Sequence, residues 1–184
     1  MKLTPSGSQT VGPYFRIGLQ HLCANDLQPV QDADTVTVHG KVIDANGVPV
    51  SDAMLEMWHA DRDGRFDAGL PNGSGRPACF TRVATDDNGS FRFTIVRPGA
   101  VVSEQDMRQA PHIAVLVFAR GLQRHLITRM YFPDEAANSS DAVLQSIPEA
   151  RRRTLIAKCD SNMPGAVEWN VVLQGDDETV FFAW

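Results

Sequence analysis

The feature that most restricts the fold of this chain is an almost unbroken apolar run over residues 112–119, His-Ile-Ala-Val-Leu-Val-Phe-Ala. A strand exposed on one face alternates apolar with polar residues, so a continuous apolar run indicates burial on both faces. Such a strand lies at the centre of a sandwich or beneath a partner subunit. Arg120 and Gly121 end the run.

Other segments carry the shorter patterns of β-strands. We expect strands over 35–44, 52–60, 80–85, 91–96, 126–132 and 167–174. Asn46-Gly47 is a hairpin-type turn signal, and a second one, at 86–89, separates two of these strands. About seven short strands joined by turns predict an all-β fold, an antiparallel β-sandwich.

The remaining segments complete one predicted domain over 1–184. Residues 1–34 have little periodicity and form an N-terminal arm, expected to be ordered because its aromatic and aliphatic side chains need apolar contacts. Short helices are expected in the C-terminal third, one capped by Ser140-Asp141 and ending near 146, another within 149–158. Residues 61–79 form a long glycine-containing loop.

Composition argues against several kinds of partner. A net charge of -5 works against non-specific binding to nucleic acid or anionic lipid. No run approaches 18 apolar residues, so neither a membrane span nor a signal peptide is expected. The three cysteines are far apart and form no C-x-x-C pair. We therefore expect a cytoplasmic protein with reduced thiols.

Local motifs for catalysis are weak. The serine in 72–75, Asn-Gly-Ser-Gly, lacks the spacing of a nucleophile elbow, and the five histidines show no metal-binding spacing. His112 and Ala114 share one face of a predicted strand, where two histidines would together hold a metal ion. Ala114 has no donor atom, so His112 also reads as an ordinary packing histidine.

A set of motifs spread along nearly the whole chain resembles the intradiol ring-cleavage dioxygenases. The matching motifs are Thr4-Pro5-Ser6, Gln9-Thr10, Gly12-Pro13-Tyr14, Leu55-Glu56-Met57-Trp58-His59-Ala60-Asp61, Arg97-Pro98-Gly99, Ala110-Pro111-His112-Ile113, Phe118-Ala119-Arg120-Gly121, Tyr131-Phe132 and Glu178-Thr179-Val180-Phe181-Phe182. Each motif is weak alone, but together they are specific.

The resemblance implies a non-haem ferric ion held by two tyrosines and two histidines in the catalytic subunit of the family. At the four matching positions this chain has Phe66, Val101, His112 and Ala114. Only His112 keeps a ligand atom, and Fe(III) needs anionic oxygen donors. We therefore expect no iron in this chain, a surviving site with altered ligands being the alternative.

The resemblance also implies a role beside a partner. In two-subunit members, an alpha-type arm walls the substrate pocket of a metal-bearing beta subunit, and Thr10, Gly12, Pro13 and Tyr14 match that arm. A turn held down by a half-buried tyrosine explains the same residues. Arg120 matches a pocket arginine that would orient a substrate carboxylate, and an ion pair at an interface explains it equally well.

The implied activity is cleavage of protocatechuate by O2 to 3-carboxy-cis,cis-muconate, in a higher-order hetero-oligomer whose beta subunit holds the Fe(III). Two rival functions remain open. One is a self-sufficient catechol-type intradiol dioxygenase, which needs the two missing tyrosinates. The other is a non-catalytic β-sandwich binding module, which needs no partner of the beta type.

Overall fold

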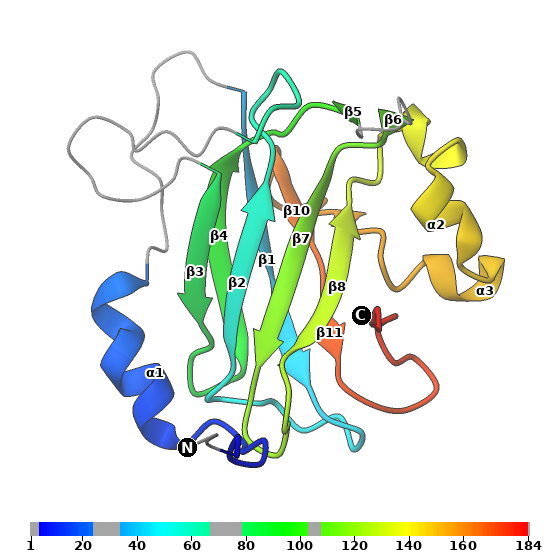
Figure 1. Cartoon of the computed structure of the whole chain (residues 1–184). Coiled ribbons are helices and arrows are strands. Elements are labelled where there is room, and N and C mark those ends of the chain that lie inside the picture. Colours follow the sequence, from blue (N-terminus) through cyan, green and yellow to red (C-terminus); the bar gives the residue numbers. More distant parts are fainter. Residues whose placement is uncertain (1–3, 24–33, 67–78, 103–107, 184) are drawn as a thin grey trace.

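Two β-sheets face each other across an apolar core in the computed structural model (Figure 1). The structure describes residues 4–23, 34–66, 79–102 and 108–183. The strands are β1 Thr35–Ile43, β2 Met54–His59, β3 Phe80–Ala84, β4 Ser90–Val96, β5 Val101–Val102, β6 Arg108–Gln109, β7 His112–Phe118, β8 Leu126–Tyr131, β9 Lys158–Cys159, β10 Ala166–Glu168 and β11 Val171–Val172. The predicted all-β sandwich is confirmed.

One sheet has the order β3-β2-β7-β8, and all its pairings are antiparallel. The apolar run forms β7, a central strand as expected. Its inward side chains, Ile113, Val115 and Val117, are at most 1% exposed. The outward side chains Ala114 and Phe118 are only half-buried in this chain. The prediction that β7 is buried on both faces is therefore correct for the inner face and only partly correct for the outer face.

The second sheet is mixed, which corrects the expectation of purely antiparallel pairing. Strand β1 pairs with β4 antiparallel on one edge and with both β10 and β11 in parallel on the other. The segment 167–174, expected as one strand, is divided into β10 and β11. The alternate residues Val167, Trp169 and Val171 are at most 5% exposed, whereas Leu173, the next in the alternation, is only partly buried.

The division between β10 and β11 lies opposite Gly40. The Trp169 amide still donates to the His39 carbonyl at 2.9 Å, while the Lys41 amide donates to the Asn170 side chain at 2.8 Å instead of to a carbonyl. A Cβ atom on residue 40 would lie 1.7 Å from the Trp169 carbonyl oxygen. Gly40 is therefore required by the close approach of the neighbouring backbone.

Both predicted turns form, but they connect different sheets. Asp86 accepts hydrogen bonds at 2.8 Å from the amides of Asn88 and Ser90, and Gly89 has a φ of 69°. Strands β3 and β4 on either side of this turn nevertheless belong to opposite sheets. A turn signal specifies the reversal of the chain, whereas strand pairing depends on which sheet each apolar face meets.

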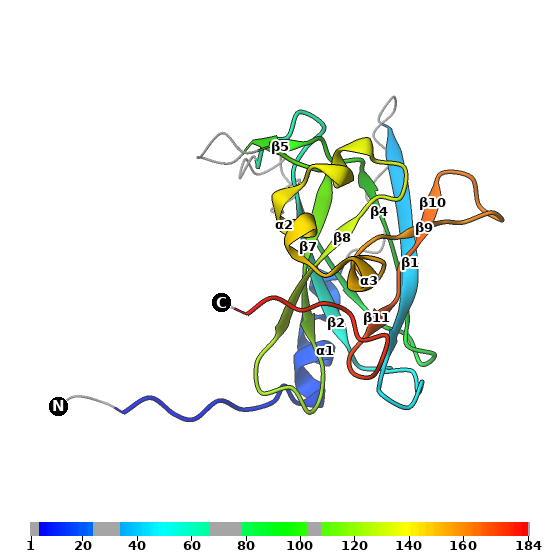
Figure 2. The same cartoon turned by 90° about the vertical axis from the view of Figure 1, so that its right-hand side faces the viewer.

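The helices are short and lie at the margins of the sandwich (Figures 1 and 2). They are α1 Pro13–Leu19, α2 Ala142–Ser146 and α3 Glu149–Arg152, with 3-10 turns η1 Gln20–Leu22 and η2 Ala136–Ser139. Asp141 caps α2 as expected by accepting from the Leu144 amide at 2.8 Å. The helix predicted within 149–158 stops at Arg152. In the described ranges, no helix reaches the length and apolarity that a membrane crossing requires.

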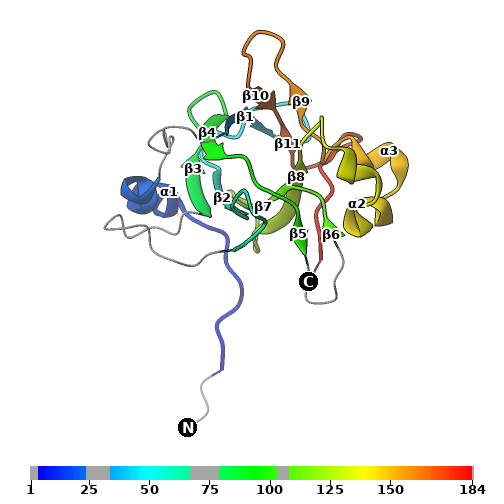
Figure 3. The ribbon, with the colours of Figure 1, turned by 90° about the horizontal axis from the view of Figure 1, so that it is seen from above.

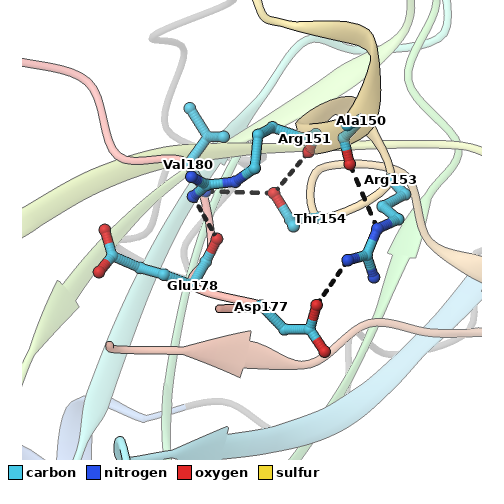
Figure 4. A network of polar contacts seen from close by, with 7 residues as sticks. All are labelled: Ala150, Arg151, Arg153, Thr154, Asp177, Glu178 and Val180. Carbon is cyan, nitrogen blue, oxygen red and sulfur yellow. Dashed lines mark hydrogen bonds and ion pairs between the residues drawn. The ribbon is translucent and has the colours of Figure 1, made fainter. Parts of the chain in front are cut away.

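A polar network anchors the C-terminal segment to α3 (Figure 4). Arg151 donates to the Glu178 carbonyl at 2.7 Å, and Thr154 accepts from the Val180 amide at 3.2 Å. Further along the segment, the Phe182 amide donates to the carbonyl of Ile127 in β8 at 2.8 Å. The network thus holds Phe182 beside β8, where its ring becomes part of a pocket wall.

Candidate functional site

The beginning of β7 positions the histidine that the family resemblance picks out. The side chains of His112 and Ala114 point to the outer face of the sheet, because Ile113 between them points inward. His112 is 6% exposed, and its Nδ1–H donates to the Ala110 carbonyl at 2.8 Å. Burial, followed by the nearby Arg129 charge, lowers the pKa of His112 to about 4. The ring is therefore neutral near pH 7, and Nε2 is its acceptor.

Two loops bring the other predicted ligand positions toward β7. The Gly99 amide donates to the Asp61 carbonyl at 2.8 Å, which joins the segment 61–66 to the segment that leads into β5. A Cβ on residue 64 would lie 1.9 Å from the Ala100 carbonyl oxygen, so Gly64, at a φ of 78°, permits this contact. The contact places Phe66 close to Val101.

All four predicted ligand positions line one pocket of about 370 Å³. Phe66, Val101, His112 and Ala114 are joined there by residues from β6, β8, α2 and the C-terminal segment. These additional wall residues are Gln109, Ile127, Thr128, Arg129, Val143 and Phe182. The four positions matched from the sequence thus lie around one cavity, and their correspondence to the family's metal ligands stays a prediction.

The donor atoms in this pocket do not fit a ferric ion. Phe66, Val101 and Ala114 carry no atom that binds a metal, and a single neutral imidazole cannot replace two phenolates. Within the described ranges, no group of three or more His, Cys, Asp or Glu side chains is arranged to hold a metal. No step of a reaction is assigned to iron in this pocket.

Four polar residues of the pocket region, Gln109, Arg129, Tyr131 and Asp141, were not predicted as site residues from the sequence. Arg129 Nη1 donates to Gln109 Oε1 at 2.9 Å and to the Tyr131 hydroxyl at 3.4 Å. The Tyr131 hydroxyl donates to Asp141 at 3.1 Å, and burial raises the pKa of Tyr131 to about 12. The strand pattern of 126–132 shows which residues share a face, but only the register of β8 against β7 places Arg129 opposite Ala114.

The arm residues and Arg120 meet at the other end of β7. The Thr10 hydroxyl accepts from the Gly121 amide at 2.8 Å, and Arg120 forms an ion pair with Asp52. The ring of Phe15 lies 5.1 Å from that of Phe118, measured between centroids. Thr10 and Phe15 of the arm therefore contact β7 and the turn that follows it. Contacts of this kind are what the prediction of an ordered arm needs.

The arm contains a helix that the sequence analysis did not predict. Gly12 is the residue before α1, and Pro13 occupies the first turn, where its missing amide hydrogen costs nothing. Tyr14 and Ile17 on this helix are 82% and 60% exposed. The explanation of Tyr14 as a half-buried structural residue is therefore wrong for this chain, and the part of the predicted arm over 24–33 lies outside the described residues.

The two sets of predicted site residues lie at opposite ends of one strand. From His112 to Phe118, β7 spans roughly 20 Å at about 3.3 Å per residue. Thr10, Tyr14 and Arg120 therefore do not enter the pocket that contains the four ligand positions. In Figures 2 and 3 the first described residues extend away from the body of the molecule, and residues 4–10 are all exposed.

Comparison with known proteins identifies the family. The model of a family described as dioxygenase matches residues 12–175. The chain belongs to the intradiol dioxygenase family. The dioxygenase domain of a dioxygenase and carbohydrate-binding protein fusion from Streptomyces sp. SirexAA-E has a similar fold, with a TM-score of 0.65 and 26% identity. That match covers 83% of this chain and 88% of the other.

Curated intradiol dioxygenases include both chain types of a two-chain enzyme. The protocatechuate 3,4-dioxygenase alpha chain of Burkholderia cepacia is 42% identical over 199 residues, covering 99% of this chain and 98% of the relative. The beta chain from the same organism is 32% identical over 161 residues, covering 79% and 67%. The similarity to the alpha chain is thus higher and runs along the full length.

Proposed function

We propose that this chain is the alpha subunit of a heteromeric protocatechuate 3,4-dioxygenase. In this proposal a beta subunit holds the Fe(III), and this chain supplies part of the wall of the substrate pocket. The complex cleaves the bond between the two hydroxyl-bearing ring carbons of protocatechuate with O2, and both oxygen atoms enter 3-carboxy-cis,cis-muconate. The cytoplasmic location and the higher-order hetero-oligomer stay predictions.

One observation carries the proposal: the arm residues and Arg120 are gathered at a surface far from the chain's own ligand positions. Tyr14 exposes 82% of its surface there, and the Arg120 side chain is 67% exposed although it pairs with Asp52. Exposed aromatic side chains and arginines are typical anchors of an interface. These groups therefore suit a pocket completed by another subunit.

The surface beside the arm leaves room for such a subunit. Gln9 and Val11 of the arm face the β7–β8 loop and Phe182 across a hollow of about 620 Å³. The arm is thus held at Thr10, Phe15 and Arg16, whereas residues 4–9 stay exposed and do not pack against its own sandwich. An exposed arm of this kind gains stability when a partner covers it.

Within the proposed pocket, Arg120 has a defined task. Protocatechuate carries a carboxylate, and a guanidinium binds a carboxylate through two parallel hydrogen bonds. The bound Fe(III) would supply the activation of the dihydroxylated ring toward O2. Arg120, Gly12 and Tyr14 would bind and orient the ring, since small errors in orientation lower the rate of the chemical step.

The subunit assignment is tested by producing the chain alone and together with the beta subunit. We expect the isolated chain to contain no stoichiometric iron and to consume no O2 with protocatechuate, and the co-produced complex to do both. Iron analysis and an oxygen electrode provide the two measurements. Stoichiometric iron with O2 uptake in the isolated chain would instead indicate the self-sufficient dioxygenase, and failure to assemble with any beta chain would favour a binding module.

The role of Arg120 is tested by Arg120→Gln in the complex. Loss of a charge-assisted bond worth about 1.5–3 kcal/mol predicts a decrease of kcat/KM for protocatechuate of roughly 10- to 100-fold, with unchanged iron content. Catechol, which has no carboxylate, should show a much smaller change. Arg153→Gln is the matched control, because Arg153 is 66% exposed and also pairs with an aspartate. Equal losses for the two substrates would show that Arg120 only supports the interface.

A further inference from the structure

The pocket at the beginning of β7 carries a positive side chain, that of Arg129, on its wall. Arg129 of β8 lies directly opposite Ala114 of β7, and both line the pocket. With Ala114 there is no imidazole at this position, and space is left beside the guanidinium. The pocket is therefore suited to an anion.

The guanidinium of Arg129 keeps donors available. Its Nη1 atom donates to Gln109 and to the Tyr131 hydroxyl. Among the residues that the structure describes, Nη2 and Nε have no hydrogen-bond acceptor, and no carboxylate lies within ion-pair distance of the guanidinium. A cation with two unused donors attracts a carboxylate, which matches its planar shape.

Asp141, which is linked to Arg129 through the Tyr131 hydroxyl, does not compete for the guanidinium. Asp141 is fully buried, and its two oxygens accept from the Ala110 amide, the Leu144 amide and the Tyr131 hydroxyl. Tyr131 therefore separates this carboxylate from the guanidinium. The positive charge that faces the pocket is satisfied only indirectly by Asp141.

The remaining walls suit a flat apolar body. Phe66, Val101, Ile127, Val143 and Phe182 supply aromatic and aliphatic surface around the polar end. Small-molecule sites typically enclose about 300–1,000 Å³ and combine apolar walls with a few convergent polar groups. A pocket of about 370 Å³ is large enough for a single aromatic ring.

We propose that this pocket is a second ligand site, which binds small aromatic carboxylates with the carboxylate on Arg129 and the ring against Phe66, Val101 and Phe182. The site belongs to this chain alone and performs no ring cleavage. It is separate from the surface formed by the arm and Arg120 and does not depend on the proposed function.

The test is calorimetric titration of the full chain, purified without a partner, with benzoate as the probe. We expect saturable binding of one benzoate per chain with a dissociation constant of about 1 mM or below, and binding of the uncharged benzamide at least about tenfold weaker. Arg129→Gln should weaken benzoate binding by about tenfold or more. Arg92→Gln, an exposed arginine on β4 of the other sheet, should leave it unchanged.

A second variant keeps the test decisive if Arg129→Gln does not fold. Ala114→Leu fills the space opposite Arg129 while retaining the charge, and it should abolish benzoate binding. No saturable binding to the wild-type chain up to about 10 mM benzoate would overturn the proposal. Equal affinity for benzamide, or full binding by the Ala114→Leu chain, would overturn it as well.

Discussion

At the scale of single residues, the chemistry of the candidate site is set by a few missing atoms. Phe66 differs from tyrosine by one oxygen, and Ala114 differs from histidine by an imidazole ring. With these side chains the pocket offers one imidazole, that of His112, while the register of β8 brings the fixed charge of Arg129 to the same pocket. The atoms present thus suit an anion better than a cation.

Residue-scale packing gives a sharp prediction at Gly40. Gly40→Ala should lower the free energy of unfolding by about 1–3 kcal/mol or more, because the added Cβ overlaps the Trp169 carbonyl and forces β10 and β11 away from β1. Chemical denaturation measures the change. Gly18→Ala is the control: nothing lies within 4 Å of its added Cβ, and a helical Gly→Ala change stabilises by up to about 1 kcal/mol. Similar stabilities for the two variants would contradict the predicted clash.

At the scale of elements, the arm is the part of the chain that packs only partly against its own sandwich. Helix α1 is held by the Arg16 guanidinium, which donates to the Thr85 carbonyl at 2.8 Å, and by the contact of Phe15 with Phe118. Its exposed Tyr14 and Ile17 have no comparable packing. Such a helix, fixed on one side and exposed on the other, presents side chains to a neighbouring molecule.

The hydroxyl of Thr10 is expected to hold the arm in register with the turn after β7. Thr10→Val keeps the shape of the side chain and removes the acceptor of the Gly121 amide. We expect faster hydrogen exchange at Gly121, a loss of stability of only about 0.5–1.5 kcal/mol, and a higher KM for protocatechuate in the complex with iron retained. Ser8→Ala, also in the exposed arm, is the control. Unchanged exchange at Gly121 would show that the bond does not order the arm.

At the scale of the whole molecule, segments distant in sequence assemble the pocket, so the set of side chains that line it is a property of the assembled sandwich. Phe66 and Val101 come from loops joined by the bond between Gly99 and Asp61, whereas Ala114 comes from the central strand. Because these positions share one pocket, donor atoms placed on them would lie around a single cavity.

The triple variant Phe66→Tyr, Val101→Tyr and Ala114→His should therefore recover two phenolates and two imidazoles at one place. Arg129 would oppose a cation there, so we expect firm Fe(III) binding only when Arg129→Gln is added. Iron stoichiometry and a visible tyrosinate-to-iron absorption band provide the measurements. The control is the triple variant combined with Arg92→Gln. Equal iron content in the quadruple variants that carry Arg129→Gln and Arg92→Gln would show that the charge of Arg129 does not oppose iron binding.

The sequence by itself determined the sandwich, most strand ranges and the cap at Asp141, because alternation, turn residues and capping residues are local properties. The four ligand positions, taken from the family resemblance, stay a prediction. The structure alone decided the parallel pairing of β1 with β10 and β11, the division at Trp169 and the connection of β3 and β4 to opposite sheets. It alone also decided that Arg129 faces Ala114. These features depend on register and on which faces meet across the core, and non-local contacts of this kind leave no local signal in the chain.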